Sequence, residues 1–227
     1  MVESSSKKSS VPSRIGDYII DYAMRSGGMG SVYRARQISM HRFVALKVIR
    51  RALLRDDPAY AARFQQEIRL LAQLEHPNVV RILEAGMDKG LLFFSMEFLD
   101  GNDLRTCLRM RKSFTEIGVL KIARQIASGL DYAYDRFQII HRDVKPGNVM
   151  LLPSGVVKLL DLGVSRSLRD AAGKDGADAI TNRDEFVGTP RYVSPEQACG
   201  ADVDFHTDVY SLGVAMFELL AGVPPYD

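Results

Sequence analysis

The sequence predicts an α+β fold, with a strand-rich first part and a mainly helical second part. Short apolar segments separated by turn residues fill residues 17–97, and one helical pattern lies among them. After residue 113 the pattern changes to a long amphipathic helix and then to a helix that is apolar almost all round. A chain of 227 residues with 46% apolar residues can bury a sizeable core, in one large domain or in two lobes.

The charge of the chain is concentrated in its first residues. Residues 1–14 are rich in serine and hold three basic side chains against one acidic one, so we expect a disordered tail. The rest of the chain carries 27 basic and 27 acidic residues and is therefore neutral. This balance gives no indication of a face that binds nucleic acid.

Cysteine usage and hydropathy indicate a cytoplasmic protein. Cys107 and Cys199 stand in unrelated contexts, which excludes a disulfide framework and a cysteine-based zinc site. The sequence contains no run of 18 apolar residues that could span a membrane, and its N-terminus lacks the apolar region of a signal peptide.

The first strands are expected at residues 18–20, 32–36 and 43–49. A glycine-rich stretch at 26–30 joins the first two, and glycines allow backbone amides to approach phosphate oxygens closely. Such a stretch is a weak signal alone, but Lys47 follows on the next strand and adds a cation.

One helix and two further strands complete the first part. Asp57 followed by proline predicts a helix start, and Phe64, Ile68 and Leu71 then share one face. Strands are expected at 79–86 and 91–97, joined by a tight turn at 88–90.

The second part begins with Ser113-Phe114-Thr115-Glu116, which matches a capping box. The helix that follows has an apolar face, and a hairpin is expected around residues 153–155. We expect Thr207 and Asp208 to cap the last, apolar helix over 209–220, and Gly222 to end it. Because that helix is apolar almost all round, we expect it to be buried. The apolar face of the long helix comprises Val119, Ala123, Ile126, Leu130 and Ala133.

The loop at 141–148 concentrates three kinds of chemistry at fixed offsets. The Asp143 carboxylate can accept a hydroxyl proton, the Lys145 ammonium can neutralise a phosphate, and the Asn148 amide oxygen can bind Mg²⁺. Asp161 follows the next hairpin, thirteen residues after Asn148, and supplies a second oxygen ligand. Each residue alone is compatible with an ordinary polar loop or turn.

In their order and spacing these motifs resemble those of the protein kinases. The loop His141-Arg142-Asp143-Val144-Lys145-Pro146-Gly147-Asn148 resembles the family pattern H-R-D-x-x-x-x-N, and Asp161-Leu162-Gly163 resembles Asp-Phe-Gly. The glycine-rich stretch departs from G-x-G-x-x-G-x-V at its first glycine, where Arg25 places a cation at the loop entrance.

The resemblance implies a bilobal fold, with residues 15–101 forming a small antiparallel sheet lobe and hinge and residues 102–227 a helical lobe. It implies Asp143, Lys145 and Asn148 as catalytic residues, and Asn148 and Asp161 as Mg²⁺ ligands. Glu67 would pair with Lys47. ATP would be bound by Met24, Gly27, Gly28, Gly30, Val32, Ala45, Lys47, Glu67, Met96, Glu97, Leu99 and Met150.

The function implied is that of a bacterial Ser/Thr protein kinase that transfers the γ-phosphate of ATP to protein substrates. Residues 164–186 would form a mobile activation loop, and residues 188–196 a segment that docks the substrate. Two alternatives stay open: a pseudokinase that acts as a binding or scaffold module, and a small-molecule phosphotransferase of the same fold. We also expect the natural helical lobe to continue beyond Asp227, where a membrane anchor could follow.

Overall fold

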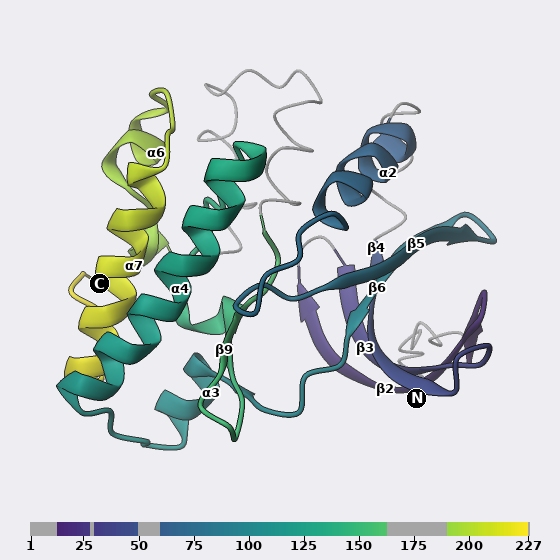
Figure 1. Cartoon of the computed structure of the whole chain (residues 1–227), viewed down its shortest axis with the longest axis horizontal. Helices are drawn as coiled ribbons and strands as arrows, with labels where there is room; N and C mark the ends of the chain where they lie inside the picture. Colours follow the sequence, from purple (N-terminus) through teal and green to yellow (C-terminus); the bar gives the residue numbers. More distant parts are fainter. Residues whose placement is uncertain (1–12, 28–29, 50–59, 163–189, 227) are drawn as a thin grey trace, which may run out of the picture.

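A computed structural model of the chain describes residues 13–27, 30–49, 60–162 and 190–226. Its first part is an antiparallel sheet of six strands in the order β1-β2-β3-β4-β6-β5 (Figure 1). This confirms the expected strand-rich first part. The strands are β1 (Arg14–Ile15), β2 (Tyr18–Gly27), β3 (Gly30–Gln37), β4 (Arg42–Ile49), β5 (Ile82–Asp88) and β6 (Leu91–Glu97).

Helix α2 (Tyr60–Leu71) packs against this sheet (Figure 1). As predicted, Phe64, Ile68 and Leu71 form one buried face, which shares a core with side chains from β4, β5 and β6. The expected start of this helix at Asp57 lies outside the described residues. A second, smaller core that includes Ile15 and other side chains of the first strands is built within the sheet itself.

The second part is mainly helical, as expected, and it contains a small sheet next to the hinge region. Helices α4 and α7 lie side by side and pack over strand β9 (Figure 1). The elements are β7 (Asn102–Asp103), α3 (Leu104–Arg109), α4 (Glu116–Phe137), η1 (Pro146–Asn148), β8 (Val149–Leu151), β9 (Val157–Leu159), η2 (Pro190–Tyr192), α6 (Pro195–Cys199) and α7 (His206–Ala221).

Two turns follow from local backbone chemistry. Lys89 and Gly90, between β5 and β6, both have positive φ (48° and 74°), as a two-residue hairpin turn of the primed type requires. This confirms the turn predicted at 88–90. Gly155 has φ of 83° and turns the chain between β8 and β9, also as predicted.

The predicted cap of α4 was placed two residues too early. Thr115, and not Ser113, is the N-cap: its backbone is extended, and its hydroxyl accepts from the Gly118 N–H at 3.1 Å. Gly118 occupies the position from which a capping box needs a side chain to return, so no reciprocal bond forms. The predicted apolar face is confirmed, because Val119, Ala123, Ile126 and Ala133 are buried and Leu130 packs against the core.

The predictions for α7 need two corrections. The helix begins at His206, and Asp208 lies within its first turn and accepts hydrogen bonds from another segment instead of capping its own helix. The helix is also not buried all round: Val214 and Leu219 face the core, while Val209 and Phe217 are 58% and 48% exposed. Gly222 ends the helix with φ of 77°, as expected.

Candidate active site

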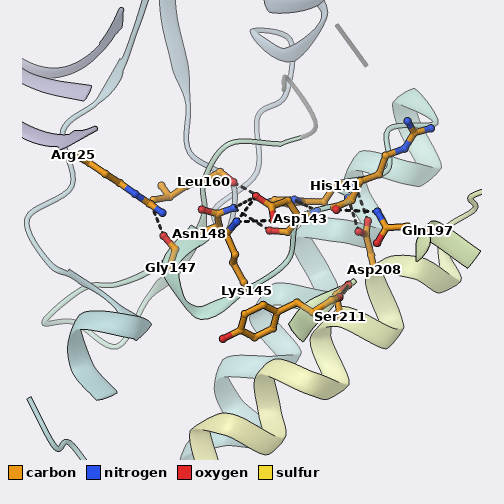
Figure 2. A network of polar contacts seen from close by, with 12 residues as sticks. Arg25, His141, Asp143, Lys145, Gly147, Asn148, Leu160, Gln197, Asp208 and Ser211 are labelled. Atoms are coloured by element: carbon orange, nitrogen blue, oxygen red, sulfur yellow. Dashed lines mark hydrogen bonds and ion pairs between the residues drawn. The ribbon is translucent and has the colours of Figure 1, made fainter. Parts of the chain in front are cut away.

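Three polar side chains of the loop before β8 meet around one carboxylate (Figure 2). The Lys145 ammonium lies 2.7 Å from each oxygen of Asp143. The Asn148 amide donates to the Asp143 carbonyl at 2.9 Å and to its carboxylate at 2.8 Å. Asn148 is buried, whereas the Asp143 side chain keeps 47% of its surface exposed. The loop therefore fixes a carboxylate and leaves it open to an incoming molecule.

Asp208 on α7 holds the backbone of this loop from below (Figure 2). Its two carboxylate oxygens accept from the N–H groups of His141 and Arg142 at 2.7 and 2.8 Å. Burial raises the pKa of Asp208, and the charge of His141 and the two backbone donors oppose that rise. Arg142 has φ of 63°, so the carboxylate secures a backbone conformation that non-glycine residues rarely adopt.

Two further contacts to this loop could not be read from the sequence. The side-chain amide of Gln197, on α6, donates to the Arg142 carbonyl at 3.1 Å. The buried His141 ring contacts the Leu160 carbonyl at 2.9 Å, next to Asp161. The loop is thus tied to α6, to α7 and to the chain segment after β9.

Lys47 on β4 and Asp161 after β9 form an ion pair across the site. Their Nζ–Oδ1 distance is 2.5 Å, and their side chains are 11% and 26% exposed. Burial acts to raise the pKa of Asp161, but the charge of Lys47 and the hydrogen bond from it lower that pKa overall. Asp161 therefore carries a negative charge at neutral pH and can bind a cation through oxygen.

The sequence from residue 18 to residue 227 matches the family model for the protein kinase domain. The chain belongs to the protein kinase family. The kinase domain of Mycobacterium tuberculosis PknI has the same fold, with a TM-score of 0.74 and 31% sequence identity over 96% of this chain and 80% of that domain. The sheet part is therefore the N-lobe of a kinase fold and the helical part its C-lobe.

The curated relatives are bacterial Ser/Thr kinases. Serine/threonine-protein kinase pkn3 of Myxococcus xanthus is 38% identical over 92% of this chain and 38% of its own length. Serine/threonine-protein kinase PknB of Mycobacterium tuberculosis is 36% identical over 95% of this chain and 34% of its own length. The kinase chain thus spans between about a third and two fifths of these relatives. None of its described helices is long and apolar enough to cross a membrane.

The interaction expected between Lys47 and Glu67 differs from the one observed in this kinase fold. Among the described side chains, Lys47 forms its ion pair with Asp161 and none with Glu67, which lies half-buried on α2 and makes other interactions. Asp161 competes well for the one ammonium, because its charge has lost much of its hydration within the cleft.

Most of the expected adenine-binding residues are brought together between the lobes. Val32, Ala45, Met96 and Leu99 all belong to, or pack against, the core cluster between the N-lobe sheet and α2. Ala45 and Met96 are direct cross-strand neighbours on β4 and β6.

The other expected contacts lie around this group. Met150 is half-buried on β8, and Met24 is exposed on β2. The Glu97 carboxylate pairs with Lys158 at 2.6 Å and accepts from the Arg81 N–H at 2.9 Å. These two contacts fix the strand that leads into the hinge.

The glycines of the kinase nucleotide loop have different local roles. A Cβ at Gly30 would lie 2.1 Å from the Val48 carbonyl oxygen, so this position requires glycine. A Cβ at Gly27 would meet nothing within 4 Å. Gly28 lies outside the described residues, as does the expected activation loop at 164–186.

Arg25 reaches across the cleft from the N-lobe to the C-lobe (Figure 2). Its Nη1 donates to the Gly147 carbonyl at 2.7 Å. The sequence reveals the substitution of the family's first glycine, but a contact between residues 122 positions apart depends on the folded geometry.

Proposed function

We propose that this chain is an ATP-dependent protein serine/threonine kinase, acting through a cleft between an N-lobe and hinge (15–101) and a C-lobe (102–227). The observation that carries the proposal is the arrangement of Asp143, Lys145 and Asn148 in one loop, facing the Lys47–Asp161 pair. The curated relatives, which are Ser/Thr kinases, support the choice of hydroxyl acceptors in proteins.

Asp143 would act as the base for the acceptor hydroxyl. Its exposed carboxylate can accept the hydroxyl proton while Lys145 and Asn148 hold its orientation. Lys145, which contacts the same carboxylate, would then neutralise charge on the transferring phosphoryl group. Lys47 would bind the nucleotide phosphates from the opposite lobe.

Mg²⁺ fits the remaining oxygen donors. The Asn148 amide nitrogen faces Asp143, which leaves its oxygen as an available ligand, and Asp161 adds a carboxylate. When bound, the metal would offset the negative charge of the β- and γ-phosphates. The described residues contain no group of three or more His, Cys, Asp or Glu side chains able to hold a metal, so ATP oxygens would complete the coordination.

The test is transfer of radiolabelled γ-phosphate from ATP to a generic protein acceptor. We expect transfer with Mg²⁺, none with excess EDTA, and phosphoserine or phosphothreonine in the product. Asp143→Asn should lose transfer, and Asp131→Asn, an exposed aspartate on α4, should keep it. Nucleotide binding without transfer by the wild-type chain would favour the pseudokinase alternative. Phosphorylation of small molecules but not of proteins would favour the other.

A further inference from the structure

Two arginines from different lobes converge on Gly147. Arg25 Nη1 donates to its carbonyl at 2.7 Å. A Cβ at Gly147 would lie 3.4 Å from Arg25 Nη2 and 3.4 Å from Arg105 Nε, so both guanidinium groups border the space that a side chain would fill. Gly147 stands between Lys145 and Asn148, which places this pair of cations beside the proposed catalytic residues.

The positive charge of this pair is not neutralised by an ion pair. Among the described side chains, neither arginine forms one, and the partners that the structure gives them are neutral: the Gly147 carbonyl for Arg25 and the Tyr192 phenol for Arg105. Asp161 senses the charge of Arg25, but its carboxylate is already engaged in the ion pair across the site. Two like charges so close repel one another, and a bound anion would relieve that repulsion. Guanidinium groups also present fixed pairs of N–H donors that suit carboxylate and phosphate oxygens.

The position of Arg105 indicates what kind of anion would bind. Arg105 borders Gly147 on one side and Tyr192 on the other. Tyr192 belongs to the segment at 188–196, and its hydroxyl donates to Glu218 while its carbonyl accepts from Ser211 at 2.8 Å, both on α7. The arginine pair therefore lies between the catalytic loop and this segment, along the path that an acceptor polypeptide would follow.

We propose that Arg25 and Arg105 form an anion subsite that selects acceptor serines or threonines with an acidic or phosphorylated residue nearby. This inference rests on the proposed function, because it names the substrate class of that same site. Gly147 contributes by having no side chain, which leaves the space between the two guanidinium groups open to the ligand. Arg25 contributes a cation at a position where the family pattern has glycine.

The test compares peptides that share one serine acceptor and differ at a single neighbouring position, filled by Gln, Glu or phosphoserine and moved along both sides of the acceptor. We expect kcat/KM for the best-placed anionic peptide to exceed that for its Gln counterpart by about tenfold, which corresponds to about 1.4 kcal/mol. Arg25→Gln and Arg105→Gln should each remove most of this ratio. Arg109→Gln, which removes an exposed charge from the same helix α3, should keep it.

A second measurement does not depend on turnover. The same peptides, carrying a fluorophore, are titrated with each variant without ATP, and their anisotropy is followed at low and at high salt. We expect the anionic peptides to bind the wild-type chain more tightly, with a preference that weakens as salt screens the charges. The Glu and phosphoserine peptides show separately which anion the subsite prefers.

Three results would overturn the inference. The first is equal binding and turnover of neutral and anionic peptides by the wild-type chain. The second is a preference that survives in both Arg25→Gln and Arg105→Gln. The third is a change in KM for ATP alone in these variants, which would assign the pair to the nucleotide. A chain that phosphorylates no peptide would contradict the proposed function instead, and the anisotropy ratio would still decide the anion subsite.

Discussion

The contact between Asp208 and the catalytic loop gives a prediction whose size can be worked from the structure. The carboxylate is 4% exposed, and it accepts from the backbone N–H groups of His141 and Arg142. Asp208→Ala would leave both donors buried without an acceptor. Each unsatisfied buried donor costs about 1–3 kcal/mol, so the variant should lose about 2–6 kcal/mol of stability. A domain of ordinary stability has only about 5–15 kcal/mol to lose.

Asp208→Asn separates the two bonds. The carboxamide keeps one acceptor oxygen, but its NH₂ group meets the second backbone donor without accepting from it. The loss should then be about half that of the alanine variant. Phosphotransfer should fall in both variants beyond the effect of unfolding, because Arg142, with its positive φ, precedes Asp143 directly.

The measurement is urea unfolding followed by circular dichroism, combined with kcat determined well below the melting temperature. Asp131→Ala, on the exposed face of α4, is the matched control and should stay within about 0.5 kcal/mol of wild type. If Asp208→Ala were as stable and as active as that control, the carboxylate would not be holding the loop, and its two backbone contacts would not account for the shape of the site.

Three further predictions concern the cleft. Asp143→Asn should lower phosphotransfer by about 10²–10⁴ and leave ATP affinity nearly unchanged in a nucleotide titration, and loss of ATP binding would contradict its role as base. Gly30→Ala should lower the melting temperature and ATP affinity because of its backbone clash at 2.1 Å, whereas Gly27→Ala should do neither; equal effects would refute this distinction. Because the pKa of Asp161 is lowered in the folded state, its pair with Lys47 should stabilise the fold above the ordinary aspartate pKa and stop doing so as pH falls through the lowered one. The melting difference between wild type and Asp161→Asn should therefore shrink toward acid pH, and a growing difference would contradict this.

The parts of the fold that could be predicted are those set by short-range pattern. The spacing of Phe64, Ile68 and Leu71 defines the buried face of α2, and this needs no knowledge of the partner surface. The turn at Lys89 and Gly90 is likewise local. The cap of α4 was misplaced because Ser113 and Thr115 both carry suitable hydroxyls, and the backbone geometry that chooses between them is settled by packing.

The candidate site divides in the same way. The offsets between Asp143, Lys145 and Asn148 are short, so one loop brings them together and the sequence could indicate their meeting. The partner of Lys47 was a different problem, because two carboxylates were in reach along the family pattern. Which of them pairs with the ammonium depends on relative burial and on the position of α2, and neither quantity is encoded in residue spacing.

Arg25 shows what a departure from a family pattern can and cannot reveal. The sequence shows that glycine is replaced by a cation, which indicates altered electrostatics at the cleft entrance. It does not show that Gly147 lacks a side chain at the point that this cation reaches, or that Arg105 reaches the same point from α3. A lone arginine at the edge of a loop would be solvated and have little effect, but two guanidinium groups over one open space concentrate positive potential there. The chemical meaning of the substitution therefore lies in the second arginine, and only the fold connects the two.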